Sequence, residues 1–275
     1  MKGHLSRLRK QVNQGAFSIL ELLIATTLSV LMLTLLLTLL SGVLDTWTST
    51  AARSETFGEA RAALHLLERE LNLIVPPIRH DGEEVDDLIT KLETTEGETV
   101  DVLAFLCKVP HEGQPSTEAF SDICGVTYFI APETDQPNAP NALFRRLIPS
   151  EETFTKLGTA PAELFTDSCK VDNLAEVVAQ NVIGFKISQR DQELKLIPPT
   201  ETVGAPPPLS DSAETPPVAA YVEVTLKVIS SRSAQSYFDP TIPAIQKERI
   251  ALQESREFTF RVARRHPLSV LSSNQ

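Results

Sequence analysis

The chain has 275 residues, of which 42% are hydrophobic and 22% are charged, and its formal net charge is -11. This length and composition suit one folded domain plus an appendage, and they exclude a collagen-like or wholly disordered chain. The acidic excess argues against a nucleic-acid-binding protein, because phosphate binding needs clustered Lys and Arg. We therefore expect no nucleic acid among the partners of this protein.

The first sixteen residues reverse this charge balance. They contain Lys2, Arg7, Arg9 and Lys10 and no acidic residue. The whole chain has a formal charge of -11, so the part after residue 16 has a formal charge of -15. By the positive-inside rule, a basic segment that precedes an apolar run stays in the cytoplasm. We expect residues 1–16 to be a cytoplasmic leader that sets the membrane topology of the chain.

Residues 17–44 form an apolar run without Pro, Lys, Arg or Asp, in which Glu21 carries the only formal charge. As a helix the run would be about 42 Å long, more than the roughly 30 Å of a bilayer's hydrocarbon core. A secretory signal has an apolar core of only about 7 to 15 residues, although residues 49–51 imitate its cleavage site. We therefore expect residues 17–44 to span a membrane, with lipid as a partner and the carboxy-terminal part outside the cytoplasm.

The helical pattern continues beyond the apolar run. Apolar residues recur at spacings of three and four, and charged residues fill the positions between them. No proline occurs before Pro76, so we expect one helix whose amphipathic part covers residues 45–75. The apolar stripe either packs on the protein's own domain, which we favour, or forms a coiled coil with a partner. Its apolar positions are Phe57, Ala60, Leu64, Leu67, Leu71 and Ile74, and its charged positions are Arg53, Glu55, Glu59, Arg61, Glu68, Arg69 and Glu70.

Residues 76–266 have the composition of a β-rich domain. Alternation along residues 222–228 and 258–262 predicts strands with one apolar face and one solvent-exposed face. Such strands suit an antiparallel sheet covered by the amphipathic half of the helix, so the expected fold class is α+β. Runs typical of strands occupy residues 100–109, 125–131, 142–148, 182–189, 220–230 and 256–263.

Three segments of this part lack strand patterns. Residues 81–98 are acidic, and residues 198–217 contain seven prolines, so we expect both to be exposed loops. Residues 267–275 should form a frayed tail.

Signs of catalysis or metal binding are few. The five histidines are scattered, and His111 with Glu112 lacks the second histidine of a zinc-protease helix. We expect a structural protein rather than an enzyme, with no cofactor and no metal. Two interpretations stay open for Cys107, Cys124 and Cys169, which have no CxxC spacing: one disulfide and one remaining thiol, or three buried small apolar residues. The histidines are His4, His65, His80, His111 and His266.

The segment GAFSILELLIA, residues 15–25, resembles the cleavage and methylation motif of type IV pilins and of the pseudopilins of type II secretion systems. The shared features are a basic leader, a small residue, Phe, a hydroxyl residue, two aliphatic residues, Glu and a long apolar helix. The resemblance implies that a prepilin peptidase cuts between Ala16 and Phe17, that the Phe17 amine is methylated, and that Glu21 is the fifth mature residue. The sequence departs from the family at the cut, where Gly is usual; Gly15 lies one residue early and Ala16 occupies the site.

The resemblance also implies a role for Glu21. In this family the carboxylate at the fifth position is thought to meet the terminal amine of an adjacent subunit. Such a charge pair offsets much of the cost of burying either ion alone, which for an acid in a membrane is about 2.5 to 3.5 kcal/mol. Glu21 would then set the stagger between neighbours. The alternative is a carboxylate near the cytoplasmic interface that stays hydrated.

The order of the parts is similar to two branches of this family. VVAQNVIGF at residues 177–185 and VEVTL at residues 222–226 resemble segments of the J-type minor pseudopilins, and FGEARAALHLLERELN at residues 57–72 resembles the Verru_Chthon cassette protein C group. These resemblances imply a minor, tip-located subunit of a filament. Its partners would be other pseudopilins and an inner-membrane assembly platform, and its carboxy-terminal domain would lie in the periplasm or outside the cell.

Two further interpretations remain from other classes of protein. One is a single-pass anchored domain that is never cleaved and that binds an envelope partner. The other is an anchored enzyme whose site has no motif in the sequence.

Overall fold

The computed structural model describes residues 18–75, 79–80, 83–84, 88–93, 99–115, 121–134, 136, 138–159, 164–165, 169–197 and 220–263. The expected leader, the proline-rich loop at residues 198–217 and the tail at residues 267–275 lie outside this part of the chain. The chain divides into two compact units, Met1–Thr50 and Ala51–Gln275.

One helix, α1 (Ile19–Leu71), runs through the boundary between the two units, which confirms the prediction of a single long helix. It ends at Leu71 rather than at residue 75. The chain then turns and pairs with the end of strand β4 (Thr99–Lys108), beyond the residues of β4 that pair with Leu88–Glu93. The Val75 N–H donates to the Leu106 carbonyl at 2.8 Å, and the Lys108 N–H donates to the Leu73 carbonyl at 3.1 Å. Sheet hydrogen bonds therefore replace helix hydrogen bonds before Pro76 is reached.

The six strands predicted from the sequence are all present, with ends shifted by at most two residues. They are β4 (Thr99–Lys108), β5 (Ile123–Pro132), β6 (Asn141–Ile148), β8 (Val182–Arg190), β10 (Tyr221–Ile229) and β11 (Ser255–Ala263).

Several elements were not predicted. One of them, β3 (Leu88–Glu93), lies within residues 81–98, so the expectation of a continuous exposed loop there was wrong. Leu88 is buried in the core, which explains why this part of an acidic segment forms a strand. The other unpredicted strands are β1 (Arg79–His80), β2 (Glu83–Glu84), β7 (Ala175–Ala179) and β9 (Leu196–Ile197), and the helices are η1 (His111–Gly113), α2 (Ser150–Thr159), α3 (Ser231–Phe238) and α4 (Ala244–Glu254).

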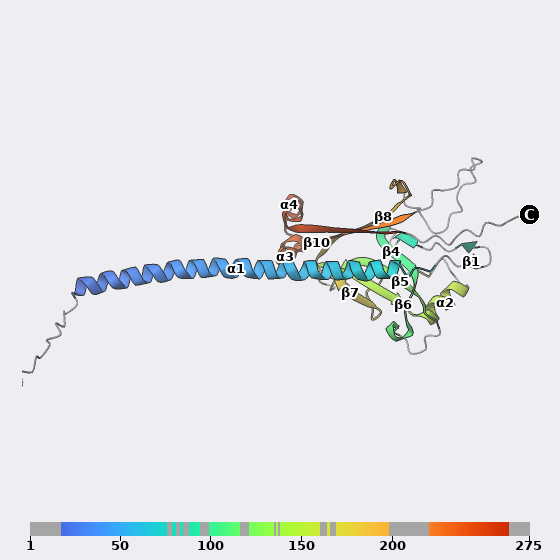
Figure 1. Ribbon diagram of the computed structural model, residues 1–275, viewed down its shortest axis with the longest axis horizontal. Helices are drawn as coiled ribbons and strands as arrows, with labels where there is room; N and C mark the ends of the chain where they lie inside the picture. The colour runs from blue at the N-terminus through green and yellow to red at the C-terminus, as the bar shows by residue number, and fades with distance from the viewer. Residues whose placement is uncertain are drawn as a thin grey trace, which may run out of the picture. The chain divides into compact units, whose positions relative to one another are not determined.

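The strands form two main antiparallel sheets rather than the single sheet that we expected. One has five strands in the order β3-β4-β5-β6-β7, and the other has four in the order β11-β10-β8-β9; β1 and β2 form a separate pair. Figure 1 shows the carboxy-terminal part of α1 running between these two sheets. The α+β class and the antiparallel pairing are thus as predicted.

The main hydrophobic core forms where α1 meets both sheets. Its members include Leu64 and Leu67 of α1, Phe105 of the five-stranded sheet and Leu226 of the four-stranded sheet. The apolar stripe therefore packs on the protein's own domain, as we favoured, and is not exposed for a coiled coil. A second cluster covers the opposite face of the five-stranded sheet. It contains Val102, Phe129 and Phe144 from the sheet and Leu157, Leu164 and Phe165 from α2 and the segment after it.

The face of β10 that was predicted to be solvent-exposed is only partly so, because Glu223 on that face is 9% exposed. Arg261 lies directly opposite Glu223 on β11 and donates to it, and Arg190 of β8 donates to its Oε1 atom at 2.7 Å. Hydrogen bonds from Arg190 and then Arg261 lower the pKa of the Glu223 carboxyl below its usual value. Two arginines thus cover a carboxylate that alternation alone assigned to solvent.

We expect Leu67→Ala to destabilise the protein more than any exposed leucine substitution. Leu67 is 0% exposed between the two sheets, and removing a core leucine side chain costs about 2–5 kcal/mol. Denaturant unfolding of the purified full-length protein in detergent measures the change. Leu252→Ala in α4, where the side chain is 75% exposed, is the matched control and should change the free energy of unfolding by about 0.5 kcal/mol or less. Equal losses in the two variants would contradict the placement of Leu67 in the shared core.

Candidate functional site

The first half of α1 is apolar and exposed over its whole surface. Among the described residues, α1 is the one helix long and apolar enough to cross a membrane, and no residue of its most apolar window is buried by the protein. Large exposed side chains include Ile19, Met32 and Leu39. Leaving such surface in water costs roughly 25 cal/mol per Å². Residues 19–44 therefore suit surroundings of lipid or of other protein.

Several hydroxyl residues in this half donate to carbonyls of the helix itself. Thr34 donates to the Val30 carbonyl at 2.5 Å, Thr38 to the Thr34 carbonyl at 2.7 Å, and Ser41 to the Leu37 carbonyl at 2.9 Å. Each bond returns to the preceding turn of the helix, which satisfies the hydroxyl without a bond to water. The hydroxyl residues are therefore compatible with an apolar environment.

Glu21 lies in the first turn of α1, and its side chain is exposed. A carboxylate in this position is favoured by the partial positive charge of the helix amino terminus, but that effect is small. The other predicted site residues lie outside the described residues. They are the cleavage residues Ala16 and Phe17 and the leader residues Lys2, Arg7, Arg9 and Lys10.

A buried ion pair attaches the second half of α1 to the five-stranded sheet. Glu70 of α1 is 6% exposed. Arg145 of β6 donates to Glu70 Oε1 through Nη2 at 2.6 Å and through Nε at 3.0 Å, and the Tyr128 hydroxyl of β5 donates to Oε2 at 2.6 Å. Arg145 also donates to Glu176 Oε1 of β7 at 2.6 Å. Both oxygens of the buried carboxylate are thereby satisfied, which offsets its desolvation.

Glu70 is buried, although it is one of the charged positions between the apolar residues of the stripe. Glu70 precedes Leu71 and follows Leu67 by three positions, so it lies at the margin of the apolar stripe. Its partners come from β5 and β6, which are distant in sequence. Burial, followed by the nearby Glu70 carboxylate, raises the pKa of the Tyr128 phenol well above its usual value, so Tyr128 remains a neutral hydrogen-bond donor.

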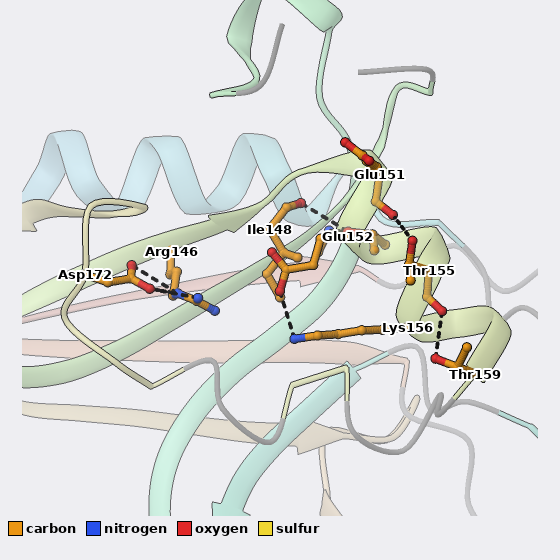
Figure 2. Close-up of polar contacts among 10 residues, drawn as sticks. Arg146, Ile148, Glu151, Glu152, Thr155, Lys156, Thr159 and Asp172 are labelled. Carbon is orange, nitrogen blue, oxygen red and sulfur yellow. Dashed lines mark hydrogen bonds and ion pairs between the residues drawn. The ribbon is translucent and has the colours of Figure 1, made fainter. Parts of the chain in front are cut away.

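A second group of polar contacts lies at the corner between β6 and α2 (Figure 2). Arg146 donates to Asp172 Oδ2 through Nη2 at 2.8 Å and through Nε at 3.1 Å. Lys156 and Glu152 pair within α2 at 2.9 Å, and Thr155 donates to the Glu151 carbonyl. The Arg146–Asp172 bonds hold the segment before β7 against the sheet, whereas the other two bonds lie within α2. We assign all of them a structural role.

The side chains considered for metal binding or catalysis do not come together. In the described ranges there is no group of three or more His, Cys, Asp or Glu residues that could hold a metal ion. His65 and His111 are exposed, and His65 pairs with Glu68 at 3.5 Å. Cys107 and Cys124 are fully buried, whereas Cys169 is half-buried.

The fold and the helix define an α+β protein with antiparallel sheets and a long apolar amino-terminal helix that is able to span a membrane. Comparison of the sequence with models of known protein families gave no match, and comparison with curated proteins gave none either.

We expect Glu70→Gln to destabilise the protein by about 3–5 kcal/mol, because the substitution leaves the buried Arg145 charge without its main partner. The matched control is Glu176→Gln, which removes the partner of Arg145 that is 60% exposed. This control should cost about 1 kcal/mol or less. Denaturant unfolding of both variants checks the prediction, and similar losses would mean that Glu70 does not dominate the attachment of α1.

Proposed function

We propose that this protein is a pseudopilin-like structural subunit of a type II secretion or type IV pilus-like filament. A prepilin peptidase cuts it after Ala16 and methylates the Phe17 amine, and residues 17–44 then assemble with the helices of other pseudopilins. It serves as a minor component near the filament tip, delivered by an inner-membrane assembly platform. The protein resides in the inner membrane as a single-pass protein, with its carboxy-terminal domain in the periplasm or outside the cell.

The observation that carries the proposal is the apolar half of α1, which is exposed all round and bears a single carboxylate in its first turn. In the bilayer, lipid covers this surface. The helix can leave the bilayer only if its apolar side chains are covered again, and side-by-side packing with similar helices does so. The basic leader supports the proposal because it keeps the amino terminus at the cytoplasmic face until it is removed.

The lone acid supplies the specific contact in this scheme. Cleavage before Phe17 creates a positive amine at the end of the apolar helix, and Glu21 offers the opposite charge on a neighbouring subunit. In a medium of low dielectric constant the attraction between such charges is strong. A subunit in the wrong register would leave both charges buried and unpaired, so the pair sets the stagger of the helices.

The other half of α1 supplies the connection to the domain. The Glu70–Arg145 ion pair and the core around Leu67 hold residues 56–71 of the helix in the domain. In a filament, a displacement of this helical segment would therefore carry its domain with it.

The first experiment is the intact mass and amino-terminal sequence of the protein recovered from native membranes. We expect a chain that begins at methylated Phe17 and is lighter by roughly 1.8 kDa, the mass of a sixteen-residue leader. Ala16→Leu should abolish processing, because a large side chain replaces a small one beside the scissile bond. Ala25→Leu, a similar change within the apolar run, should be processed normally.

A native chain that still begins at Met1 would contradict the proposal. It would mean that the basic leader is only a topology signal, and it would favour an uncleaved anchored domain that binds an envelope partner. Normal processing of Ala16→Leu would contradict the proposed cleavage site.

Glu21→Gln should leave processing intact and weaken assembly. Loss of one partner of a charge pair in an apolar environment should lower the yield of crosslinks to sister subunits about tenfold, equivalent to about 1.4 kcal/mol. Asp45→Asn, which removes the next acid along the helix, is the control and should leave crosslinking near the native level. Crosslinking that is unchanged in Glu21→Gln would exclude the pairing role.

A further inference from the structure

Two buried cysteines lie opposite each other on neighbouring strands. Cys107 of β4 and Cys124 of β5 are register partners in the antiparallel pair. Both side chains are fully buried, and both belong to the main hydrophobic cluster, so they lie on the same face of the five-stranded sheet. Their sulfur atoms are not bonded to each other in this structure.

The backbone places this pair within reach of a covalent bond. Residues directly opposite each other in an antiparallel pair have Cα atoms about 4.5–5.5 Å apart. Disulfides join cysteines whose Cα atoms are about 4.4–6.8 Å apart. The strand pairing therefore supplies the required separation, and rotation of the side chains completes the approach.

The third cysteine is separated from this pair by the sheet itself. Cys169 packs against the second hydrophobic cluster, which lies on the opposite face of the five-stranded sheet. Side chains on the two faces of a sheet point away from each other. Of the three pairings that three cysteines allow, the fold thus favours the one between Cys107 and Cys124.

We propose that Cys107 and Cys124 form a disulfide in the exported protein and that Cys169 is left out of it. This inference rests on the proposed function in one respect, because it needs the domain to lie outside the reducing cytoplasm. One cysteine thiolate attacks an external disulfide, which releases a thiolate and leaves a mixed disulfide. The second cysteine thiolate then attacks the protein sulfur of that bond. The two cysteines lose two electrons and two protons, and the external disulfide becomes two thiols.

The bond should form while the domain folds rather than afterwards. Burial raises the pKa of Cys124 to about 11, and burial also raises the pKa of Cys107. Once α1 and the four-stranded sheet cover the pair, few thiolates exist and an external disulfide cannot reach them. Pairing of β4 with β5 brings the two thiols together earlier, since these strands are neighbours in sequence.

The position of the bond gives it a structural role. Cys107 also pairs with Ile74, in the segment after α1. A disulfide at this point would fasten β5 to the strand that receives the end of the helix. It would therefore strengthen the attachment of the segment after α1 to the five-stranded sheet.

The test is to refold the reduced full-length protein from denaturant, in detergent, with a mixture of oxidised and reduced glutathione. Thiols are then blocked by alkylation, and the unreduced protein is digested and analysed by mass spectrometry. We expect one linked peptide pair containing Cys107 and Cys124, with Cys169 alkylated. Its formation should be at least roughly tenfold faster during refolding than in protein that was folded before glutathione was added.

Two variants and one sample from cells complete the experiment. Cys169→Ser should retain the linked peptides, whereas Cys124→Ser should lose them. Links that involve Cys169, or full alkylation of all three cysteines after refolding, would overturn the proposal. Protein from native membranes, alkylated before lysis, should carry the same link. Reduced Cys107 and Cys124 in a chain that begins at Phe17 would overturn the disulfide and leave the proposed function standing. A Cys107–Cys124 link in a chain that begins at Met1 would support the disulfide and overturn the proposed function.

Discussion

The packing of residues 56–71 of α1 between the two sheets is the interaction on which the rest of the domain depends. Each sheet presents an apolar face, and the same helical stripe covers both of them. The five-stranded sheet needs a second cover on its other face, which α2 and the segment after it provide. Without the helix, the described sheets of four and five strands would lose the helical stripe from their shared core. The attachment of α1 is thus a condition for the fold and not an addition to it.

The same helix has two different surroundings along its length. One face of residues 56–71 is buried by protein, whereas the large side chains of its first half are covered by nothing in the described chain. A continuous helix with this division can be held by its own domain at one end and by lipid or other helices at the other. The proposed filament subunit uses both properties, because assembly acts on the apolar half while the domain stays fixed to the other half.

Three carboxylates on apolar or alternating segments illustrate how differently charge can be accommodated. Glu70 is compensated inside the domain by Arg145 and Tyr128, and Glu223 is covered by Arg190 and Arg261. Glu21 lies exposed at the start of an apolar helix. The first two have partners within the chain, and the proposed function gives the third a partner on another subunit. The contrast explains why Glu21 is the acid whose substitution should affect assembly rather than folding.

The sequence by itself determined the elements whose pattern is local. The apolar run, the stripe from Phe57 to Leu71 and the six predicted strands arise from the composition or periodicity of neighbouring residues, which a single chain displays directly. Tertiary structure alone decided the division into two sheets, the burial of Leu88, the partners of Glu70 and Glu223, and the opposition of Cys107 and Cys124. All of these depend on strand order and register, and the partners of Glu70 and Glu223 come from segments far apart in sequence. A charged residue beside an apolar stripe has the same pattern whether it meets water or an arginine, so only the fold distinguishes the two cases.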